Sequence, residues 1–248
     1  MQNESGLSYD IFNVPLQFTG IPTEGQASIN VYNTFEQLPT YNFNFLKGNW
    51  AVSDIHKLFS MNVTSGLPAH YIPSQKIKRA DFVSMLVKAI KLPTEEVKQT
   101  RTTNKKNQPV QFTFPDVLPE RGDFPYIMAA YKAGIASGRG NGMFYPDHAL
   151  QLEEAVFMVV RALGLSILGL EPTNMTKFVD DADVSDWAKQ EMYAAVRMGL
   201  IFPDETGRIH PTSELSKAQA AALINGLVQY MRVELRTDYA EHIVNYTN

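Results

Sequence analysis

The chain has 248 residues, of which 44% are hydrophobic and 19% are charged, so it is long enough and apolar enough to bury a substantial core. Its formal net charge of −4 excludes broad nucleic-acid binding, which needs a basic face, although a local basic pocket stays compatible with it. The absence of cysteine excludes disulfides, thiolate metal sites and cysteine nucleophiles.

The N-terminal residues 1–40 differ from the rest of the chain. Two β-prone segments, 9–18 and 27–35, flank the turn-forming stretch Pro22-Thr23-Glu24-Gly25, which predicts a short β-hairpin. The first residues lack the basic and apolar stretches of a secretion signal, and no segment approaches the roughly 18 apolar residues of a membrane span. We therefore expect either a cytosolic chain or a mature or excised piece, and the repeats described next favour the second.

Three segments repeat one pattern: a helix, a turn that ends in a proline, and a second helix. The first helices are predicted near residues 50–61, 124–133 and 186–198. Four residues after each proline comes an apolar residue, called its anchor below, which gives the pairs Pro73 and Ile77, Pro146 and Leu150, and Pro211 and Leu215. Apolar residues three and four apart then predict an amphipathic helix in each copy. Units this small cannot bury an apolar face alone, so we expect the three copies to pack together.

The expected organisation follows from these repeats. Repeats 1, 2 and 3 cover residues 41–92, 111–165 and 175–230. The polar stretch 93–110 is predicted to be an exposed insert or linker, and residues 231–248 a C-terminal helical tail.

In order and spacing, these segments resemble the S-layer homology domain over about residues 41–230. The motif of that family opens with F-x-D-V, continues with a Trp-Ala helix start, G-I-I-x-G and D-G-T-F-x-P, and ends with T-R-A-E. The matching segments are Phe114-Pro115-Asp116-Val117, Phe178-Val179-Asp180, Trp50-Ala51, Trp187-Ala188, residues 134–138, Gly142-Met143-Phe144-Tyr145-Pro146 and Lys78-Arg79-Ala80-Asp81.

The resemblance implies a mainly α fold in which three helix-loop-helix repeats form a pseudo-threefold arrangement around a bundle of the T-R-A-E helices. It implies a non-catalytic module that anchors a protein to the cell surface, outside the cell in the wall or S-layer. In that family, grooves between repeats bind an anionic secondary cell-wall polysaccharide, in some members a pyruvylated one. We expect no cofactor, no nucleic-acid partner and no membrane span.

The repeats depart from the family motif at several positions. The arginine of T-R-A-E is kept as Arg79, whereas the second repeat has Leu152 and the third has Lys217, and Gly122 stands where the second tryptophan is expected. The alternative function is therefore a structural or protein–protein interaction module in a surface layer or complex, with other surface-layer proteins as partners and self-association through residues 230–246.

Arg79 is the first candidate for ligand binding, because a guanidinium forms two parallel hydrogen bonds with a carboxylate. Its place just inside a helix N-terminus, where free N–H groups favour an anion, supports this role. The alternative is a salt bridge to Asp81 or Asp54. Lys217 is the matching candidate in the third repeat.

The other candidates each have a structural alternative. Trp50 and Trp187 are suited to stacking on a sugar, but packing in the core between repeats is the favoured interpretation. Asp116 and Asp180 are suited either to sugar hydroxyls or to capping a turn. His210 lies in a loop that a ligand could contact.

Glycines complete the set of candidates. Gly138 and Gly142 are predicted to permit positive φ in a tight turn and close approach of the backbone to a ligand. The stretch 138–142 lacks the Gly-Lys-Ser/Thr ending of a phosphate-binding loop.

The sequence favours neither an enzyme nor a metal site. The histidines are scattered without H-E-x-x-H spacing, and no G-x-S-x-G occurs. Asp180, Asp181 and Asp183 are interpreted as a solvated acidic turn, because no calcium-binding loop with a terminal Glu follows them.

Overall fold

The computed structural model describes residues 39, 41–64, 66, 68–94, 114–169 and 176–233, all within one compact unit that spans residues 38–248. The hairpin predicted within residues 1–40, the polar insert beyond residue 94 and the tail beyond residue 233 lie outside the described residues.

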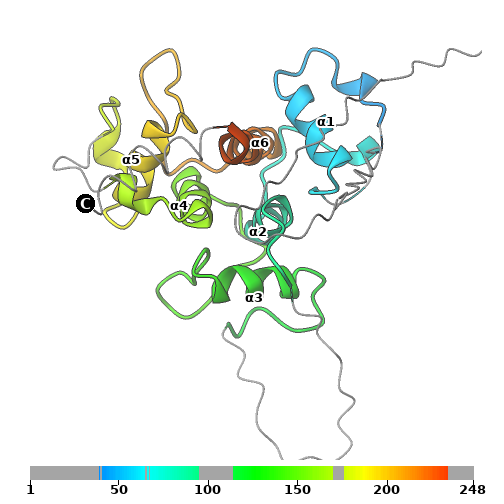
Figure 1. Ribbon diagram of the computed structural model, residues 1–248, viewed down its shortest axis with the longest axis horizontal. Helices are drawn as coiled ribbons and strands as arrows, with labels where there is room; N and C mark the ends of the chain where they lie inside the picture. The colour runs from blue at the N-terminus through cyan, green and yellow to red at the C-terminus, as the bar shows by residue number, and fades with distance from the viewer. Residues whose placement is uncertain are drawn as a thin grey trace, which may run out of the picture. The chain divides into compact units, whose positions relative to one another are not determined.

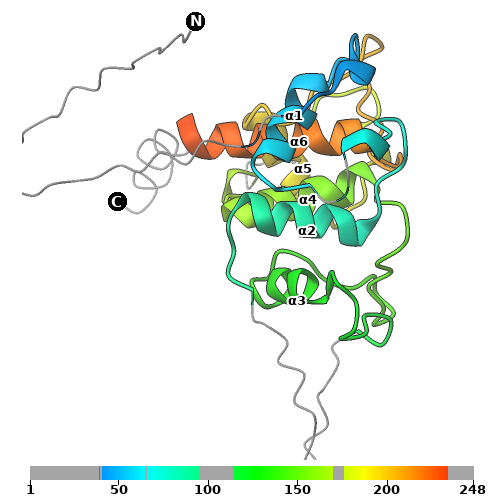
Figure 2. The ribbon, with the colours of Figure 1, turned by 90° about the vertical axis from the view of Figure 1, so that its right-hand side faces the viewer.

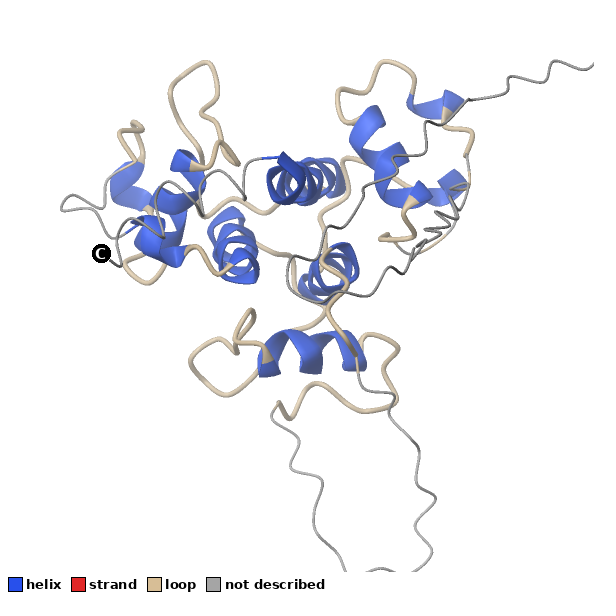
Figure 3. Ribbon diagram, viewed as in Figure 1, coloured by secondary structure: helices blue, strands red, loops and turns tan. Residues whose placement is uncertain are grey.

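The described part of the chain is helical (Figure 3). Its α-helices are α1 (Val52–Ser60), α2 (Arg79–Ala89), α3 (Phe124–Lys132), α4 (Leu152–Leu163), α5 (Lys189–Arg197) and α6 (Lys217–Val233). Short 3₁₀ helices are η1 (Asn44–Leu46), η2 (Pro68–His70), η3 (Ser166–Gly169) and η4 (Asp181–Asp183). Pairing between extended segments is limited, in these residues, to isolated β-bridges. The predicted mainly α fold is therefore confirmed.

Each repeat contributes two helices, and the repeats pack in a cycle. The first helix of each repeat packs on the second helix of the preceding one: α3 on α2, α5 on α4, and α1 on α6. The second helices α2, α4 and α6 lie together in the middle, with α1, α3 and α5 outside them (Figures 1 and 2). The last repeat therefore packs against the first, so every second helix buries its apolar face against another repeat.

The three anchors meet in a closed ring of backbone hydrogen bonds. The N–H of Leu150 donates to the carbonyl of Ile77 (3.1 Å), that of Leu215 to Leu150 (2.8 Å), and that of Ile77 to Leu215 (2.9 Å). Their exposed fractions are 1% for Ile77, 0% for Leu150 and 2% for Leu215. The expectation that the three copies pool their apolar faces is confirmed by this ring.

A second set of bonds joins the start of each second helix to the turn of the next repeat. In α2, the N–H of Arg79 donates to His148 and that of Ala80 to Pro146, both at 2.9 Å. The same pair of bonds recurs from Leu152 and Glu153 to Ser213 and Pro211, and from Lys217 and Ala218 to Gln75 and Pro73. These N–H groups at the helix starts are therefore satisfied by the neighbouring repeat. The expectation that free N–H groups beside Arg79 attract an anion is wrong for these N–H groups.

The first helix of each repeat stops in the same way. Asn62, Gly134 and Gly199 follow α1, α3 and α5 with φ of 55°, 70° and 64°. Glycine adopts this left-handed conformation at little cost, and asparagine is among the residues that tolerate it best. The first repeat therefore keeps the turn geometry although it lacks the glycine.

A surface ion pair also bridges repeats 1 and 2. The Asp147 carboxylate accepts hydrogen bonds from Arg121 Nη1 (2.7 Å) and from Lys78 Nζ of the first repeat (2.9 Å). These bonds lower the pKa of Asp147 to about 2.

Candidate functional site

A pocket of about 660 Å³ lies where parts of all three repeats meet. Repeat 1 supplies Arg79, repeat 2 supplies residues 137–140 and one side of α4, and repeat 3 supplies Ser185 and Trp187. The complete lining is Arg79, Ser137, Gly138, Arg139, Gly140, Gln151, Glu153, Glu154, Phe157, Met158, Arg161, Ser185 and Trp187.

Arg79 forms part of the pocket wall and is 5% exposed. Its Nη1 donates to Glu154 Oε1 (3.0 Å), its Nη2 donates to the carbonyl of Ser137 (2.8 Å), and the guanidinium carbon lies 4.9 Å from the centre of the Phe144 ring. Its Nε is buried and has no hydrogen-bond partner among the described residues. The salt bridge proposed from the sequence exists, but with Glu154 instead of Asp81 or Asp54.

Glu154 receives two guanidinium groups. Its two oxygens accept from Arg139 Nε and Nη2, both at 2.6 Å, in addition to Arg79. It also accepts from the N–H of Gln151 at the start of α4 (3.1 Å). One carboxylate therefore neutralises only one of two cations, which leaves positive charge at this end of the pocket. Burial lowers the pKa of Arg79, and the nearby Glu154 carboxylate offsets only part of that effect, but an arginine stays charged in proteins.

The outer rim combines a cation with aromatic rings. The Arg161 guanidinium carbon lies 4.1 Å from the centre of the Phe157 ring, and Phe157 meets Trp187 edge to face with centroids 5.3 Å apart. Arg161 Nε also contacts the buried carboxylate of Glu191 (3.3 Å). Trp187 is 50% exposed, so the rim offers a partly open apolar surface beside a guanidinium.

Glu153, 2% exposed, fixes repeat 3 to the pocket. Its carboxylate accepts from the N–H (3.0 Å) and the hydroxyl (2.8 Å) of Ser185, two residues before Trp187. A buried carboxylate with two short bonds restricts the position of this segment. Glu153 thus holds the tryptophan at the rim.

The two tryptophans differ in their surroundings. Trp187 lines the pocket, whereas Trp50 is 66% exposed and lies outside its lining. The favoured interpretation of both as core residues is wrong: the following alanines, Ala51 and Ala188, are 0% exposed and fill the core instead.

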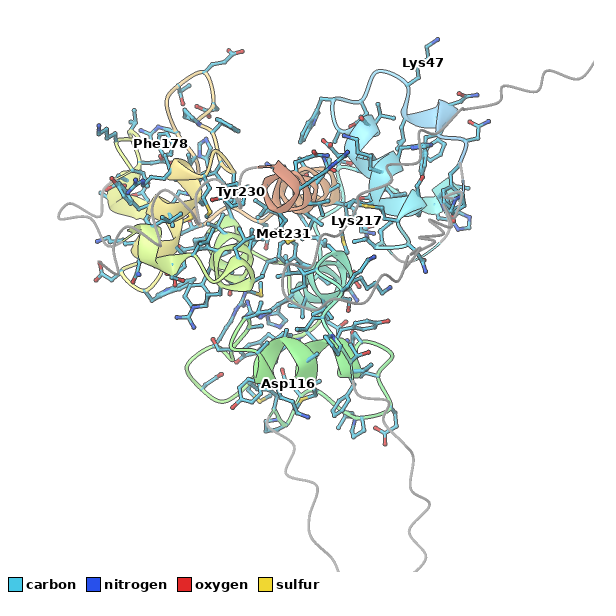
Figure 4. All side chains as sticks on the ribbon, in the orientation of Figure 1. Lys47, Asp116, Phe178, Lys217, Tyr230 and Met231 are labelled. Atoms are coloured by element: carbon cyan, nitrogen blue, oxygen red, sulfur yellow. The ribbon has the colours of Figure 1, made fainter. Side chains whose placement is uncertain are left out.

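Asp116 and Asp180 stabilise turns and do not line the pocket (Asp116 is labelled in Figure 4). Asp116 accepts from the N–H groups of Phe144 (2.9 Å) and Tyr145 (2.6 Å). Asp180 accepts in the same way from Ile209 (3.0 Å) and His210 (2.7 Å). Burial raises the pKa of Asp180, but the two backbone hydrogen bonds together lower it by more, so that the pKa lies below its ordinary value.

Lys217 and His210 also lie outside the lining of this pocket. Lys217 Nζ donates to Gln75 Oε1 (2.8 Å) and lies 5.7 Å from the centre of the Tyr71 ring. Its label in Figure 4 marks its place at α6. His210 pairs through Nε2 with Asp204 Oδ2 (2.9 Å) and has a φ of 53°.

The two predicted glycines have different roles. Gly142 has the predicted positive φ, 79°, but does not line the pocket. Gly138 lines it without positive φ; a Cβ there would come within 2.9 Å of both Phe114 Cε1 and the Met143 carbonyl. Close packing, instead of a left-handed turn, therefore explains Gly138.

Arg139, Arg161 and Phe157 line the pocket but were not among the ligand-binding residues predicted from the family motif. Arg161 stands eleven residues after the anchor Leu150, the place that Lys88 occupies after Ile77, so a basic residue recurs there in two repeats. That recurrence was the available signal.

In the described part of the chain, none of the helices is both long and apolar enough to cross a membrane.

Comparison with known proteins identifies two segments of the chain. Residues 113–156 and 177–221 match the S-layer homology domain. The chain is 33% identical over 191 residues to an exoglucanase, XynX, of Acetivibrio thermocellus, covering 75% of this chain and 16% of that protein. It is 29% identical over 178 residues to an S-layer protein of Bacillus licheniformis (71% and 18%), and 27% identical over 181 residues to S-layer protein EA1 of Bacillus anthracis (71% and 19%).

The chain thus spans less than a fifth of the length of each of these relatives. The predicted location outside the cell, in the wall or S-layer, is confirmed by these matches.

Proposed function

Because this chain belongs to the S-layer homology domain family, we propose that it anchors a larger protein to the cell wall, without catalysis of its own, by binding an anionic secondary cell-wall polysaccharide. The proposed site is the pocket lined by Arg79, Glu154 and Trp187.

The pocket lining supports an acidic saccharide as the ligand. Its ionisable groups are three guanidinium groups and two carboxylates, and one of the carboxylates, Glu154, already binds both Arg79 and Arg139. Arg161 is paired with Glu191, so the positive charge that favours an anion lies where Arg79 and Arg139 share Glu154, and guanidinium N–H groups match the geometry of a carboxylate. A pyruvate ketal on a hexose presents such a carboxylate beside an apolar ring face. Trp187 and Phe157 provide a surface for that face.

The single observation that carries the proposal is the buried Nε of Arg79, which has no hydrogen-bond partner among the described residues. A buried donor without a partner costs about 1–3 kcal/mol. Retaining that cost supports a role for Arg79 beyond its ion pair with Glu154, at the wall of a pocket that can hold a ligand.

The test is co-sedimentation of the whole chain with native bacterial cell walls, before and after the wall polysaccharide is stripped. We expect binding to native walls only. Arg161→Ala should weaken it roughly tenfold, which corresponds to about 1.4 kcal/mol. Arg208→Ala, which removes an exposed arginine outside the pocket lining, is the matched control and should leave binding unchanged.

Equal binding to stripped walls, or no effect of Arg161→Ala, would contradict the proposed site. Failure to bind native walls, together with self-association of the chain in sedimentation, would instead favour the interaction-module alternative.

A further inference from the structure

The pocket that contains Arg79 is one of three positions related by the cyclic packing of the repeats. It combines a cation from repeat 1, an acid and an aromatic ring from repeat 2, and a tryptophan from repeat 3. Because α6 packs on α1 as α2 packs on α3, the same positions can be compared at the other two seams. Arg79, Glu154 and Phe157 stand two, four and seven residues after the anchors of their own repeats.

At the seam between repeats 2 and 3, the guanidinium is missing; a lysine, Lys76, lines the hollow there, but its Nζ already donates to the carbonyl of Glu214 at 2.6 Å. Leu152 replaces Arg79, Gln219 replaces Glu154, and Ala222 replaces Phe157, while Trp50 is the corresponding tryptophan. Gln219 bonds within its own helix start, accepting from the N–H of Ser216 at 2.9 Å. A hollow of about 240 Å³ here is lined by Leu152 and Gln219 together with Lys76, Ile209, His210, Ser213, Glu214 and Leu215, and Trp50 is not part of its lining. This seam keeps a tryptophan but has neither the guanidinium nor the second ring.

At the seam between repeats 3 and 1, the aromatic surface is missing. Lys217 replaces Arg79, Ser84 replaces Phe157, and Gly122 stands at the tryptophan position. The Lys217 ammonium is already engaged by Gln75 and lies over Tyr71. This seam keeps a cation but offers no ring at either position on which a sugar could stack.

We infer that the chain binds one acidic wall saccharide, at the Arg79 seam alone, and that the other two seams do not bind it. This inference rests on the proposed function. Two independent observations support it: the complete set of cation and aromatic residues occurs at one seam, and the buried Arg79 Nε without a partner lies at the same seam. Anion recognition and ring stacking must act on one ligand together, because each alone contributes only a few kcal/mol against the cost of binding.

The test uses isothermal titration of the whole chain with a methyl hexopyranoside that carries a 4,6-linked pyruvate ketal. We expect a stoichiometry of one. Trp187→Ala should weaken binding roughly tenfold, equivalent to about 1.4 kcal/mol. Trp50→Ala is the matched control, because it removes the other exposed tryptophan at the corresponding place of the second seam, and it should leave the affinity unchanged.

The same two variants are compared in the wall-sedimentation assay. A stoichiometry of two or three, or a loss of binding from Trp50→Ala as large as that from Trp187→Ala in either assay, would overturn the single-site inference but leave wall binding intact. Binding of the unmodified chain to neither sugar nor walls would overturn the proposed function as well.

Discussion

Replacing Glu154 with glutamine probes the ion pairs of the pocket most sharply. Glu154 and Arg79 have side-chain exposures of 9% and 6%, and their Oε1 and Nη1 atoms lie 3.0 Å apart. The substitution removes the negative charge while keeping the size of the side chain and one acceptor oxygen. Arg79 is then left buried as a cation without a carboxylate partner, next to the Ser137 carbonyl and the Phe144 ring.

The expected loss of unfolding free energy depends on the contacts that remain after the substitution. Removing one partner of a buried ion pair costs about 3–5 kcal/mol, mostly because the other charge stays buried. Arg139 is partly exposed and can be hydrated instead, and the glutamine can still accept from the Gln151 N–H. We therefore expect a loss near the lower limit, about 3 kcal/mol of unfolding free energy.

The assay is urea unfolding followed by circular dichroism at pH 7, and the chain offers its own matched control. The double variant R79L/E154Q places in this pocket the pair that the next seam already has, Leu152 and Gln219. Since both partners are removed, its stability should lie within about 1 kcal/mol of the unmodified chain. Wall binding by this variant should nevertheless be lost.

Two results would refute this reasoning. Either a cost of less than about 1 kcal/mol for Glu154→Gln, or a double variant no more stable than the single one, would mean that Arg79 is not a buried charge dependent on Glu154.

The remaining predictions concern the ring, the turns and pH. Leu150→Ala should cost about 2–5 kcal/mol in thermal or urea unfolding because it opens a cavity in a fully buried position, whereas Leu118→Ala, at an exposed leucine, should cost little; similar losses for both would contradict a buried ring. Asp180→Ala should cost about 2 kcal/mol by removing a carboxylate that accepts two backbone N–H groups, and Asp183→Ala, an exposed neighbour, should be close to neutral. Asp147 has a pKa lowered to about 2, so its ion pairs stabilise the fold above the unfolded pKa near 4 and lose that effect as pH falls towards 2. Asp147→Asn should therefore cost at most about 1 kcal/mol at pH 7, because the pair is exposed, and the difference should shrink as pH falls towards 2 and disappear below it; a difference that persists below pH 2 would assign the effect to something other than charge.

The repeat architecture could be predicted from the sequence because it depends on local spacing. The interval of four residues from proline to anchor is the same in all three copies, and the helical periodicity follows it. Units with one apolar face must share it, so the meeting of Ile77, Leu150 and Leu215 was expected. The spacing does not determine the direction of the cycle. In the structure, each turn supplies carbonyl groups to the helix start of the preceding repeat.

The pocket could be predicted only in part, because its residues meet through the packing of different repeats and local spacing does not contain that packing. Arg79 was identified as a candidate, but its partner Glu154 lies 75 residues away and becomes adjacent only when repeats 1 and 2 close on each other. Trp50 and Trp187 were expected in the core because large aromatic residues are usually buried. The structure places the small Ala51 and Ala188 in the core, and the preceding tryptophans are left at the surface.

Hydrogen exchange of the three anchor amides tests the closed ring most directly. Each of these amides donates to a carbonyl of another repeat in a buried setting, so no repeat can open without breaking the ring. We predict that the amides of Ile77, Leu150 and Leu215 exchange with one common free energy, equal to that of global unfolding. Exchange of any one of them at a markedly lower free energy would show that its repeat opens independently and would contradict the closed ring on which the pocket depends.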